Sequence, residues 1–164
     1  MNKALILTNA TIVNPSNTEN DSTIYCMNGK IVGINECPAD FPREHHIIDC
    51  KNKMVTPGFI DMHIHGSGGY DAKESTMPEI KRILESCFDV GTTTILLTVT
   101  VVNDEKLKRF FDEFQKYATT NDMSTQIVGI HVEGPFINPN KKGAITPSGI
   151  STPSKERLHE ILEC

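Results

Sequence analysis

The hydrophobic and polar positions divide the chain into two parts with different periods. Up to about residue 54, short β-branched and apolar runs predict strands over 4–13, 23–27, 30–34 and 46–49. Asn28-Gly29, between the second and third runs, is typical of a two-residue hairpin turn. Four short strands cannot bury both faces by themselves, so we expect this module, residues 1–54, to pack on a partner from this chain or another.

From residue 55 onward the pattern alternates between strands and helices. Strands are predicted over 55–65, 92–102 and 126–133. The first helix begins at Thr76, spaced from Glu79 as in a capping box, and ends near Gly91. We expect Asn103 or Asp104 to cap the second helix and Thr152-Pro153 to open the third. This order predicts a parallel sheet with right-handed crossovers over residues 55–164.

The predicted helices carry apolar stripes at helical spacing. The members of the three stripes are Ile80, Ile83, Leu84, Cys87 and Phe88, then Leu107, Phe110, Phe111, Phe114 and Tyr117, then Leu158, Ile161 and Leu162. Residues recurring three and four positions apart lie on one helix face, so we expect these side chains to form a core against the sheet.

Composition narrows the class of protein. The chain has 164 residues, fewer than the roughly 250 of a complete eight-stranded βα barrel. A net charge of −5 gives no general attraction to nucleic acid or anionic membranes. We found neither an apolar run of about 20 residues nor the features of a signal peptide. Five cysteines without C-x-x-C spacing suggest reduced packing residues in the cytoplasm.

The end of the first predicted strand of the second part carries candidate metal ligands. Asp61, His63 and His65 alternate onto one face of this strand, and Ile60, Met62 and Ile64 onto the other, where covering helices would contact them. Imidazoles about 7 Å apart along the strand can converge on one metal ion. The alternative is that they are simply polar residues near a strand end.

The third predicted strand ends in a carboxylate. Gly129, His131 and Glu133 share a face, and an inward Glu133 before Gly134-Pro135 is costly unless it is paired or bound to a metal. A salt bridge to a lysine or arginine is the alternative. We favour a role other than metal ligand for His131.

These two motifs carry a family resemblance. Residues 55–66, VTPGFIDMHIHG, look like the opening strand of the amidohydrolase superfamily. Residues 131–136, HVEGPF, followed by Lys142-Gly143-Ala144, are similar to N-acetylglucosamine-6-phosphate deacetylases. The resemblance covers essentially the whole chain. It implies an α/β fold: strands of a small β-sandwich domain in residues 1–54, then the first three βα units of a metal-dependent TIM barrel in residues 55–164, with the barrel incomplete.

The resemblance also implies an activity and a set of roles. The reaction is hydrolysis of the acetamido group of N-acetylglucosamine 6-phosphate to glucosamine 6-phosphate and acetate. It uses a divalent metal, with zinc as the first candidate and iron or another metal as alternatives. Glu133 corresponds to the main metal ligand, with His63 and His65 beside it. Ala144 and Ile145 correspond to substrate contacts, although the family usually has histidine where Ile145 stands. A complete chain is expected to form a homo-oligomer, a dimer, that binds a small aminosugar phosphate.

Some of the family's site residues have no counterpart in this chain. The general-base Asp and further metal histidines of the family lie on later strands, beyond residue 164, and only His159 follows Glu133 here. We therefore expect negligible deacetylase turnover and weak metal retention from the 164 residues alone. Two other readings remain: an amidohydrolase acting on a cyclic amide, or a catalytically inactive truncated isoform.

Overall fold

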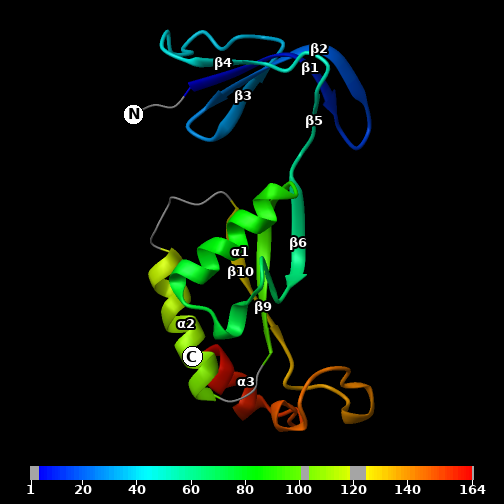
Figure 1. Cartoon of the computed structure of the whole chain (residues 1–164), viewed down its shortest axis with the longest axis vertical. Coiled ribbons are helices and arrows are strands. Elements are labelled where there is room, and N and C mark those ends of the chain that lie inside the picture. Colours follow the sequence, from blue (N-terminus) through cyan, green and yellow to red (C-terminus); the bar gives the residue numbers. More distant parts are fainter. Residues whose placement is uncertain (1–3, 101–103, 119–124, 164) are drawn as a thin grey trace. The chain divides into compact units, whose positions relative to one another are not determined.

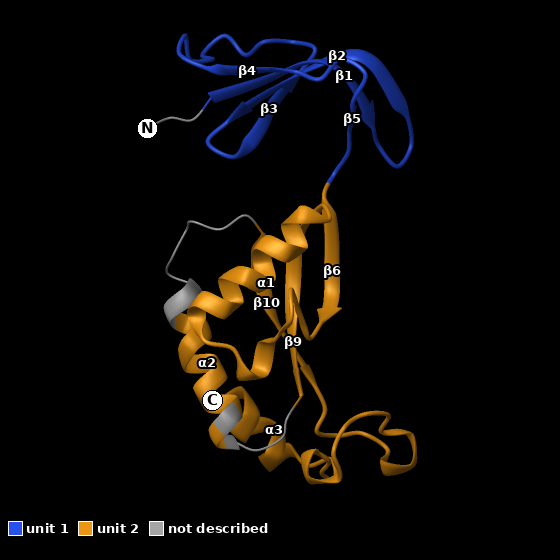
Figure 2. Ribbon diagram, in the orientation of Figure 1, with its two compact units in different colours: residues 1–57 blue, residues 58–164 orange. Residues whose placement is uncertain are grey.

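The computed structural model describes residues 4–100, 104–118 and 125–163 (Figure 1). They form two compact units, Met1–Pro57 and Gly58–Cys164 (Figure 2). Asn103, one of the two expected helix caps, lies outside the described residues. Within the described ranges, no helix combines the length and the apolar character needed to cross a membrane.

The first unit is a five-stranded sheet. Its strands are β1 (Ala4–Val13), β2 (Thr18–Met27), β3 (Lys30–Ile34), β4 (His46–Asp49) and β5 (Met54–Val55). The order is β3-β2-β1-β4, with β5 also pairing with β1. The hairpin predicted at Asn28-Gly29 is confirmed, because both residues have positive φ and Met27 pairs with Lys30.

The first unit buries a small apolar cluster, Ala10, Ile12, Ile24 and Cys50. Other large apolar side chains of its strands stay exposed: Ile31, Ile34, Ile47, Ile48 and Met54. Leu7, Cys26 and Val55 pack against this cluster and are partly buried. The described part of this unit therefore keeps considerable apolar surface in contact with solvent.

The second unit is built on a three-stranded parallel sheet in the order β10-β9-β6. The strands are β6 (Phe59–Ile64), β9 (Thr92–Thr100) and β10 (Gln126–Glu133), and the helices are α1 (Met77–Asp89), α2 (Asp104–Ala118) and α3 (Lys155–Leu162). The short strands β7 (Gly66–Ser67) and β8 (Tyr70–Asp71) form a small hairpin after β6. Three single-turn helices complete the unit, η1 (Ala72–Glu74), η2 (Pro139–Lys141) and η3 (Pro147–Gly149).

The core of the second unit lies between β9 and the first two helices. Buried residues of α1, β9 and α2 make up most of it: Ile80, Ile83, Leu84, Cys87, Ile95, Leu97, Val99, Leu107 and Phe110. Phe111 and Phe114 pack against it partly buried, and the side chain of Tyr117 lies outside the described part of the chain. The stripes predicted for the first two helices are therefore largely correct.

Three stripe positions were wrong. Phe88, near the C-terminal end of α1, is half exposed, although the neighbouring Cys87 is buried in the core. In α3 only Ile161 is buried, while Leu158 and Leu162 are exposed. This helix begins at Lys155, with Ser154 Oγ accepting a hydrogen bond from Arg157 N, rather than at Thr152-Pro153.

The strand predicted over 55–65 is two strands in the structure. β5 pairs with β1 in the first unit and β6 pairs with β9 in the second, with a break at Thr56-Pro57-Gly58. Proline lacks the N–H needed to continue a ladder. Gly58 passes so near the Thr93 side chain that a Cβ there would overlap it. The apolar pattern runs across Pro57 and Gly58, so it does not show that one strand ends and the next begins there.

The outer face of β6 was also predicted incorrectly. Ile60 and Met62 are 68% and 69% exposed, although helix contacts were expected for both. Only Ile64, at the end of the strand, reaches the core. The reason is that β6 is an edge strand in the described chain and that the helices pack over β9.

The described cysteines differ in how deeply they are buried. Cys50 and Cys87 are buried, Cys26 is half-buried, Cys37 is exposed, and all four are free. Cys164 lies outside the described residues. Burial raises the pKa of the Cys87 and Cys26 thiols, which favours their neutral form.

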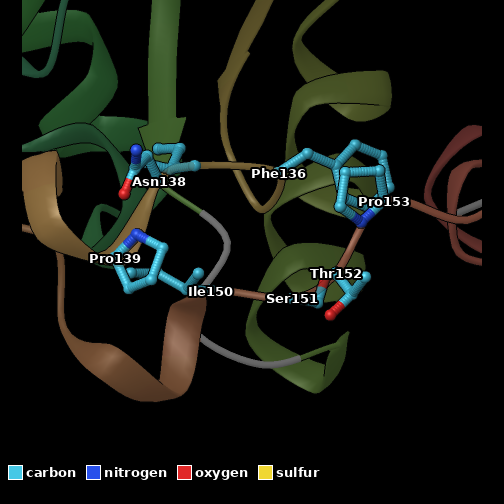
Figure 3. A pocket seen from close by; sticks show the side chains of 8 residues that line it. Phe136, Asn138, Pro139, Ile150, Ser151, Thr152 and Pro153 are labelled. Atoms are coloured by element: carbon cyan, nitrogen blue, oxygen red, sulfur yellow. The ribbon is translucent and has the colours of Figure 1, made fainter.

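The segment between β10 and α3 lines an open cavity of about 390 Å³ (Figure 3). It is lined by Phe136, Ile137, Asn138, Pro139, Ile150, Ser151, Thr152 and Pro153. The buried Ser151 Oγ has no hydrogen-bond partner among the described residues. This cavity contains none of the candidate metal ligands.

Candidate metal centre

Two parallel strands bring the predicted ligands to one edge of the sheet. His63 lies near the end of β6, His65 follows it directly, and Glu133 is the last residue of β10. β6 and β10 flank β9 in parallel, so their carboxyl ends meet at the same edge. This edge is where α/β proteins place their sites.

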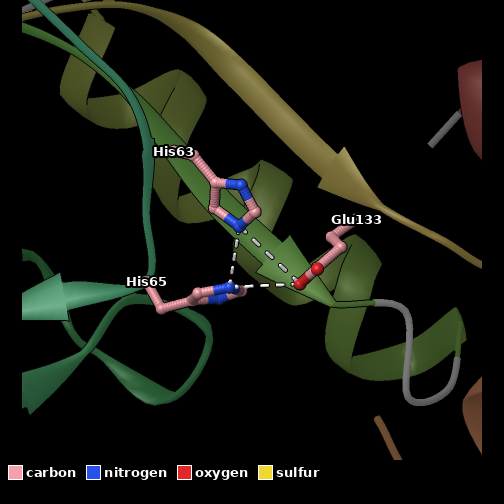
Figure 4. A group of neighbouring side chains, drawn as sticks. All are labelled: His63, His65 and Glu133. Carbon is pink, nitrogen blue, oxygen red and sulfur yellow. Dashed lines mark hydrogen bonds and ion pairs between the residues drawn. The ribbon is translucent and has the colours of Figure 1, made fainter. Parts of the chain in front are cut away.

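The three side chains point toward one another (Figure 4). His63 Nε2 lies 3.2 Å from His65 Nε2 and 3.9 Å from Glu133 Oε2, and His65 Nε2 lies 3.1 Å from that same oxygen. One ligand atom from each residue lies within 4.8 Å of the others. Ligands bound tetrahedrally to zinc at about 2.0–2.1 Å are roughly 3.4 Å apart, so these separations suit one shared ion.

Asp61 does not join this group. Its Oδ1 accepts a hydrogen bond from the backbone N–H of His63 at 3.0 Å. Although alternation predicts a shared face, the β6–β9 register is irregular between Asp61 and Ile64. The carboxylate therefore holds the backbone of β6 at His63.

The backbone after His65 is held by the small hairpin. Ala72 N donates to His65 O at 2.7 Å, which returns the chain to the strand end. Gly66 has φ of +153°, and a Cβ there would overlap Tyr70 O. A glycine is thus required at the point where the chain turns away from the candidate ligand.

Glu133 pairs with the imidazoles. Its nearest nitrogen atoms in the described ion-pair geometry belong to His63 and His65, and no described lysine or arginine takes that place. The Glu133 side chain is 31% exposed, against 51% for His63 and 44% for His65. A carboxylate beside two imidazoles is a donor set that zinc and related divalent ions accept.

His131 lies beside this group without belonging to it. Its ring packs edge-on against the His63 ring, with centroids 4.7 Å apart. Its Nδ1 lies 3.2 Å from Thr98 Oγ1, and Thr98 Oγ1 also accepts from Ile64 N at 3.0 Å. Sequence reasoning missed Thr98, which is fully buried in β9. The available signal was a polar residue within the apolar run from Ile95 to Val99.

A cavity of about 470 Å³ opens beside the ligands. His65 and Glu133 line it together with Ala144 and Ile145, the residues predicted to contact substrate. Its other lining residues are Asp71, Lys73, Thr100, Lys141, Lys142, Gly143 and Thr146. The loop after β10 thus reaches the same space as the candidate metal ligands.

Comparisons with known proteins show what this chain is similar to. A family model described as amidohydrolase family matches residues 46–90. N-acetylglucosamine-6-phosphate deacetylase of Haemophilus influenzae is 30% identical over 76% of this chain and 32% of its own length. The structure of the Thermotoga maritima deacetylase superposes with a TM-score of 0.74 and 32% identity, covering 95% of this chain and 39% of that one. This chain resembles the N-terminal portion of N-acetylglucosamine-6-phosphate deacetylases.

Other deacetylases match the same stretch. The Lysinibacillus sphaericus deacetylase is 28% identical over 93% of this chain and 39% of its own length. The Pasteurella multocida deacetylase structure gives a TM-score of 0.81 at 25% identity, covering 98% of this chain and 42% of that one. The chain spans about two fifths of the length of these relatives. The resemblance predicted from the two motifs, for an N-terminal portion only, is confirmed.

The one histidine that follows Glu133 in the sequence lies away from this edge. His159 lies on α3 and is absent from both the ligand group and the cavity lining. The structure therefore brings together three predicted ligands, His63, His65 and Glu133, and two predicted substrate contacts, Ala144 and Ile145.

Proposed function

We propose that this chain contributes part of the metal site of an N-acetylglucosamine-6-phosphate deacetylase. The reaction is hydrolysis of the acetamido group of N-acetylglucosamine 6-phosphate, which yields glucosamine 6-phosphate and acetate. The convergence of His63, His65 and Glu133 is the observation that carries this proposal. The names of the relatives supply the substrate, and the activity belongs to the whole protein.

The donor set fits a divalent metal, with zinc as the first candidate and iron as the alternative. His63 and His65 would each present Nε2, and Glu133 would present Oε2. A bound divalent ion lowers the pKa of a bound water molecule and polarises an amide carbonyl. The carboxylate of Glu133 adds the negative charge that offsets part of the charge of the ion.

The cavity beside the ligands is the proposed place for the sugar. Ala144 and Ile145 line it and can offer backbone groups to a polar ligand. Lys73, Lys141 and Lys142 line the same space and give it a positive rim toward an anionic substrate. Lys73 Nζ already lies 3.3 Å from Asp71 Oδ2, so one carboxylate partly offsets that charge.

The proposal extends to the architecture. The strands of residues 1–54 are assigned to a small β-sandwich domain, and residues 55–164 to the first three βα units of a TIM barrel. The parallel order β10-β9-β6 and the helices between these strands support the second assignment. A cytoplasmic location and a homodimeric assembly of a complete chain remain parts of the proposal.

The binding of zinc tests the metal site. Glu133→Gln keeps the shape of the side chain and removes the charge, so zinc affinity measured by competition with a chromophoric chelator should fall at least about tenfold. Glu44→Gln removes an exposed carboxylate from the first unit and should leave zinc affinity unchanged. Equal zinc affinity of the wild type and Glu133→Gln would refute the proposed metal site.

One observation favours a second candidate, an amidohydrolase that acts on a cyclic amide. Ile145 stands where the deacetylase resemblance has a histidine, so an imidazole contact with the sugar is lost. Saturation-transfer NMR with the zinc-loaded chain separates the two candidates. N-acetylglucosamine 6-phosphate should show transfer and a cyclic amide such as dihydrouracil should not, and the reverse pattern would favour the second candidate.

A further inference from the structure

A buried hydroxyl joins the three strands of the second unit just below the candidate metal ligands. Thr98 lies in the central strand β9 and is fully buried. Its Oγ1 is 3.0 Å from Ile64 N on β6 and 3.2 Å from His131 Nδ1 on β10. The strands that carry the ligands are therefore linked through one side chain.

The hydrogens of this link can be assigned from its chemistry. The backbone N–H of Ile64 can only donate, so Thr98 Oγ1 accepts this bond. The hydroxyl has one hydrogen, and His131 Nδ1 is its other partner in the described chain. A buried hydroxyl rarely leaves its hydrogen unpaired, so it donates to Nδ1. Neutral His131 then carries its hydrogen on Nε2.

This tautomer decides what His131 can do. Nδ1 is engaged by Thr98 and Nε2 carries a hydrogen, so neither nitrogen has a free lone pair for a metal ion. The ring nevertheless stands edge-on to the His63 ring, with an interplanar angle of 76°. Contact of this kind limits rotation of the His63 ring, which presents Nε2 to the candidate ion.

We propose that Thr98 is a positioning residue that fixes His131 as the Nε2–H tautomer. His131, held in this way, stays out of the ligand group and supports the His63 ring in its metal-binding orientation. The part of this inference that concerns metal affinity rests on the proposed function. The part that concerns the tautomer does not, because it follows from hydrogen bonds within the sheet.

The first experiment reads the tautomer in the zinc-free chain. Two-bond ¹H–¹⁵N spectra above about pH 8, where an ordinary histidine is neutral, distinguish a ring nitrogen with a hydrogen from one without. We expect the wild type and Thr98→Ser to show the Nε2–H form of His131. Thr98→Val removes the hydroxyl and should produce a mixture of both tautomers. Finding the Nδ1–H form in the wild type, or no change in Thr98→Val, would refute the assignment.

The second experiment measures zinc affinity of the same variants. Thr98→Val should weaken zinc binding roughly tenfold, as the loss of an outer-shell partner does, and Thr98→Ser should restore it. Thr125→Val is the matched control. It removes another fully buried threonine hydroxyl, which donates to Leu84 O and Thr92 O before the opposite end of β10. This control should lower the unfolding temperature and leave both the tautomer and the zinc affinity unchanged.

The two readouts separate the proposals. If the wild type binds no zinc but its His131 tautomer responds to Thr98→Val, the proposed metal site fails and the assignment of the tautomer stands. If zinc binds and Glu133→Gln weakens it, but Thr98→Val binds as tightly as the wild type, the positioning role is wrong and the metal site stands.

Discussion

His63, His65 and Glu133 show how little sequence is needed to place a candidate site. Alternation along a strand puts side chains two residues apart on one face, and parallel strands share an edge at their carboxyl ends. The three residues do lie within 4.8 Å of one another. We propose that they bind one metal ion, and His65 Nε2 lies 3.1 Å from Glu133 Oε2 in the same cluster.

Gly66 gives a prediction at the same scale. Gly66→Ala should displace the β7–β8 hairpin and His65 with it, because the new Cβ would overlap Tyr70 O. Zinc affinity should then fall at least about tenfold. Chelator competition measures the affinity, and far-UV circular dichroism shows that the chain stays folded.

Gly69→Ala is the control for Gly66→Ala. Gly69 also has a positive φ, +90°, but nothing within 4 Å of an added Cβ. This variant should therefore lower stability by about 1–3 kcal/mol through backbone strain alone and keep its zinc affinity. Equal loss of affinity in both variants would show that strain in the loop, rather than overlap with Tyr70, disturbs the site.

The hydrogen-bond partners of Thr98 and Asp61 could not be predicted from the sequence. That Thr98 contacts His131 depends on the register between β9 and β10, which places His131 opposite Thr98. Asp61 accepts a hydrogen bond from His63 N instead of joining the ligand group, beside an irregular stretch of the β6–β9 pairing. Neither register is encoded in a local pattern, so the partners of a buried hydroxyl or of a carboxylate cannot be read from alternation alone.

At the scale of elements, α1 was the most predictable part of the second unit. Its capping pair works as the spacing predicts: Thr76 N and Thr76 Oγ1 both donate to Glu79 Oε2, each at 2.7 Å. These two hydrogen bonds lower the pKa of the Glu79 carboxyl from its usual value of 4.5. Local chemistry alone determines such a helix start, which explains why the sequence predicts it well.

The lowered pKa of Glu79 predicts a dependence of stability on pH. A carboxylate favoured in the folded state stabilises it above the unfolded pKa, and this contribution disappears as pH falls through the lower folded pKa. Glu79→Ala should therefore lower the unfolding temperature at pH 7, and its difference from the wild type should shrink toward pH 3.

Glu85→Ala provides the comparison for this variant. Glu85 lies on the same helix and pairs with Arg82 at 3.0 Å, away from the N-terminal cap. Glu85→Ala should lower the unfolding temperature less than Glu79→Ala does at pH 7. The reason is that ion pairs of this spacing on a helix contribute only about 0.2–0.5 kcal/mol to stability. A Glu79→Ala effect that is constant from pH 7 to pH 3 would contradict the capping role.

Strand boundaries were less predictable than helix starts. β6 is an edge strand in the described chain, so its outer face lacks the helix cover that its apolar residues suggest. β10 is the other edge strand of the described sheet, and its Val128 is 56% exposed. Whether an apolar residue is buried depends on neighbours far along the chain, and a period-two pattern gives no information about them.

At the scale of the whole molecule, exposed apolar side chains predict association. Phe59, Ile60 and Met62 of β6 are 70%, 68% and 69% exposed. Exposed sheet edges with apolar side chains favour pairing with other chains. The chain should therefore show concentration-dependent association by analytical ultracentrifugation.

Substitution on β6 tests the source of that association. Ile60→Lys with Met62→Lys should reduce association without lowering the unfolding temperature, because neither residue belongs to the core. Lys30→Glu, an exposed change in the first unit, is the control for altered charge. Unchanged association in the double variant would place the contact elsewhere, for instance on the exposed isoleucines of the first unit.

Catalysis is the last property that depends on the whole molecule. The described residues supply three candidate ligands from two strands and a cavity of about 470 Å³, and the resemblance places the general base on a later strand. A metal site without a general base lacks the rate enhancement of roughly 10²–10⁴-fold that such a group contributes. The mass-verified 164-residue chain with zinc should thus release acetate from N-acetylglucosamine 6-phosphate no faster than Glu133→Gln. Robust turnover that disappears in Glu133→Gln would instead mean that these three ligands and their cavity suffice for hydrolysis.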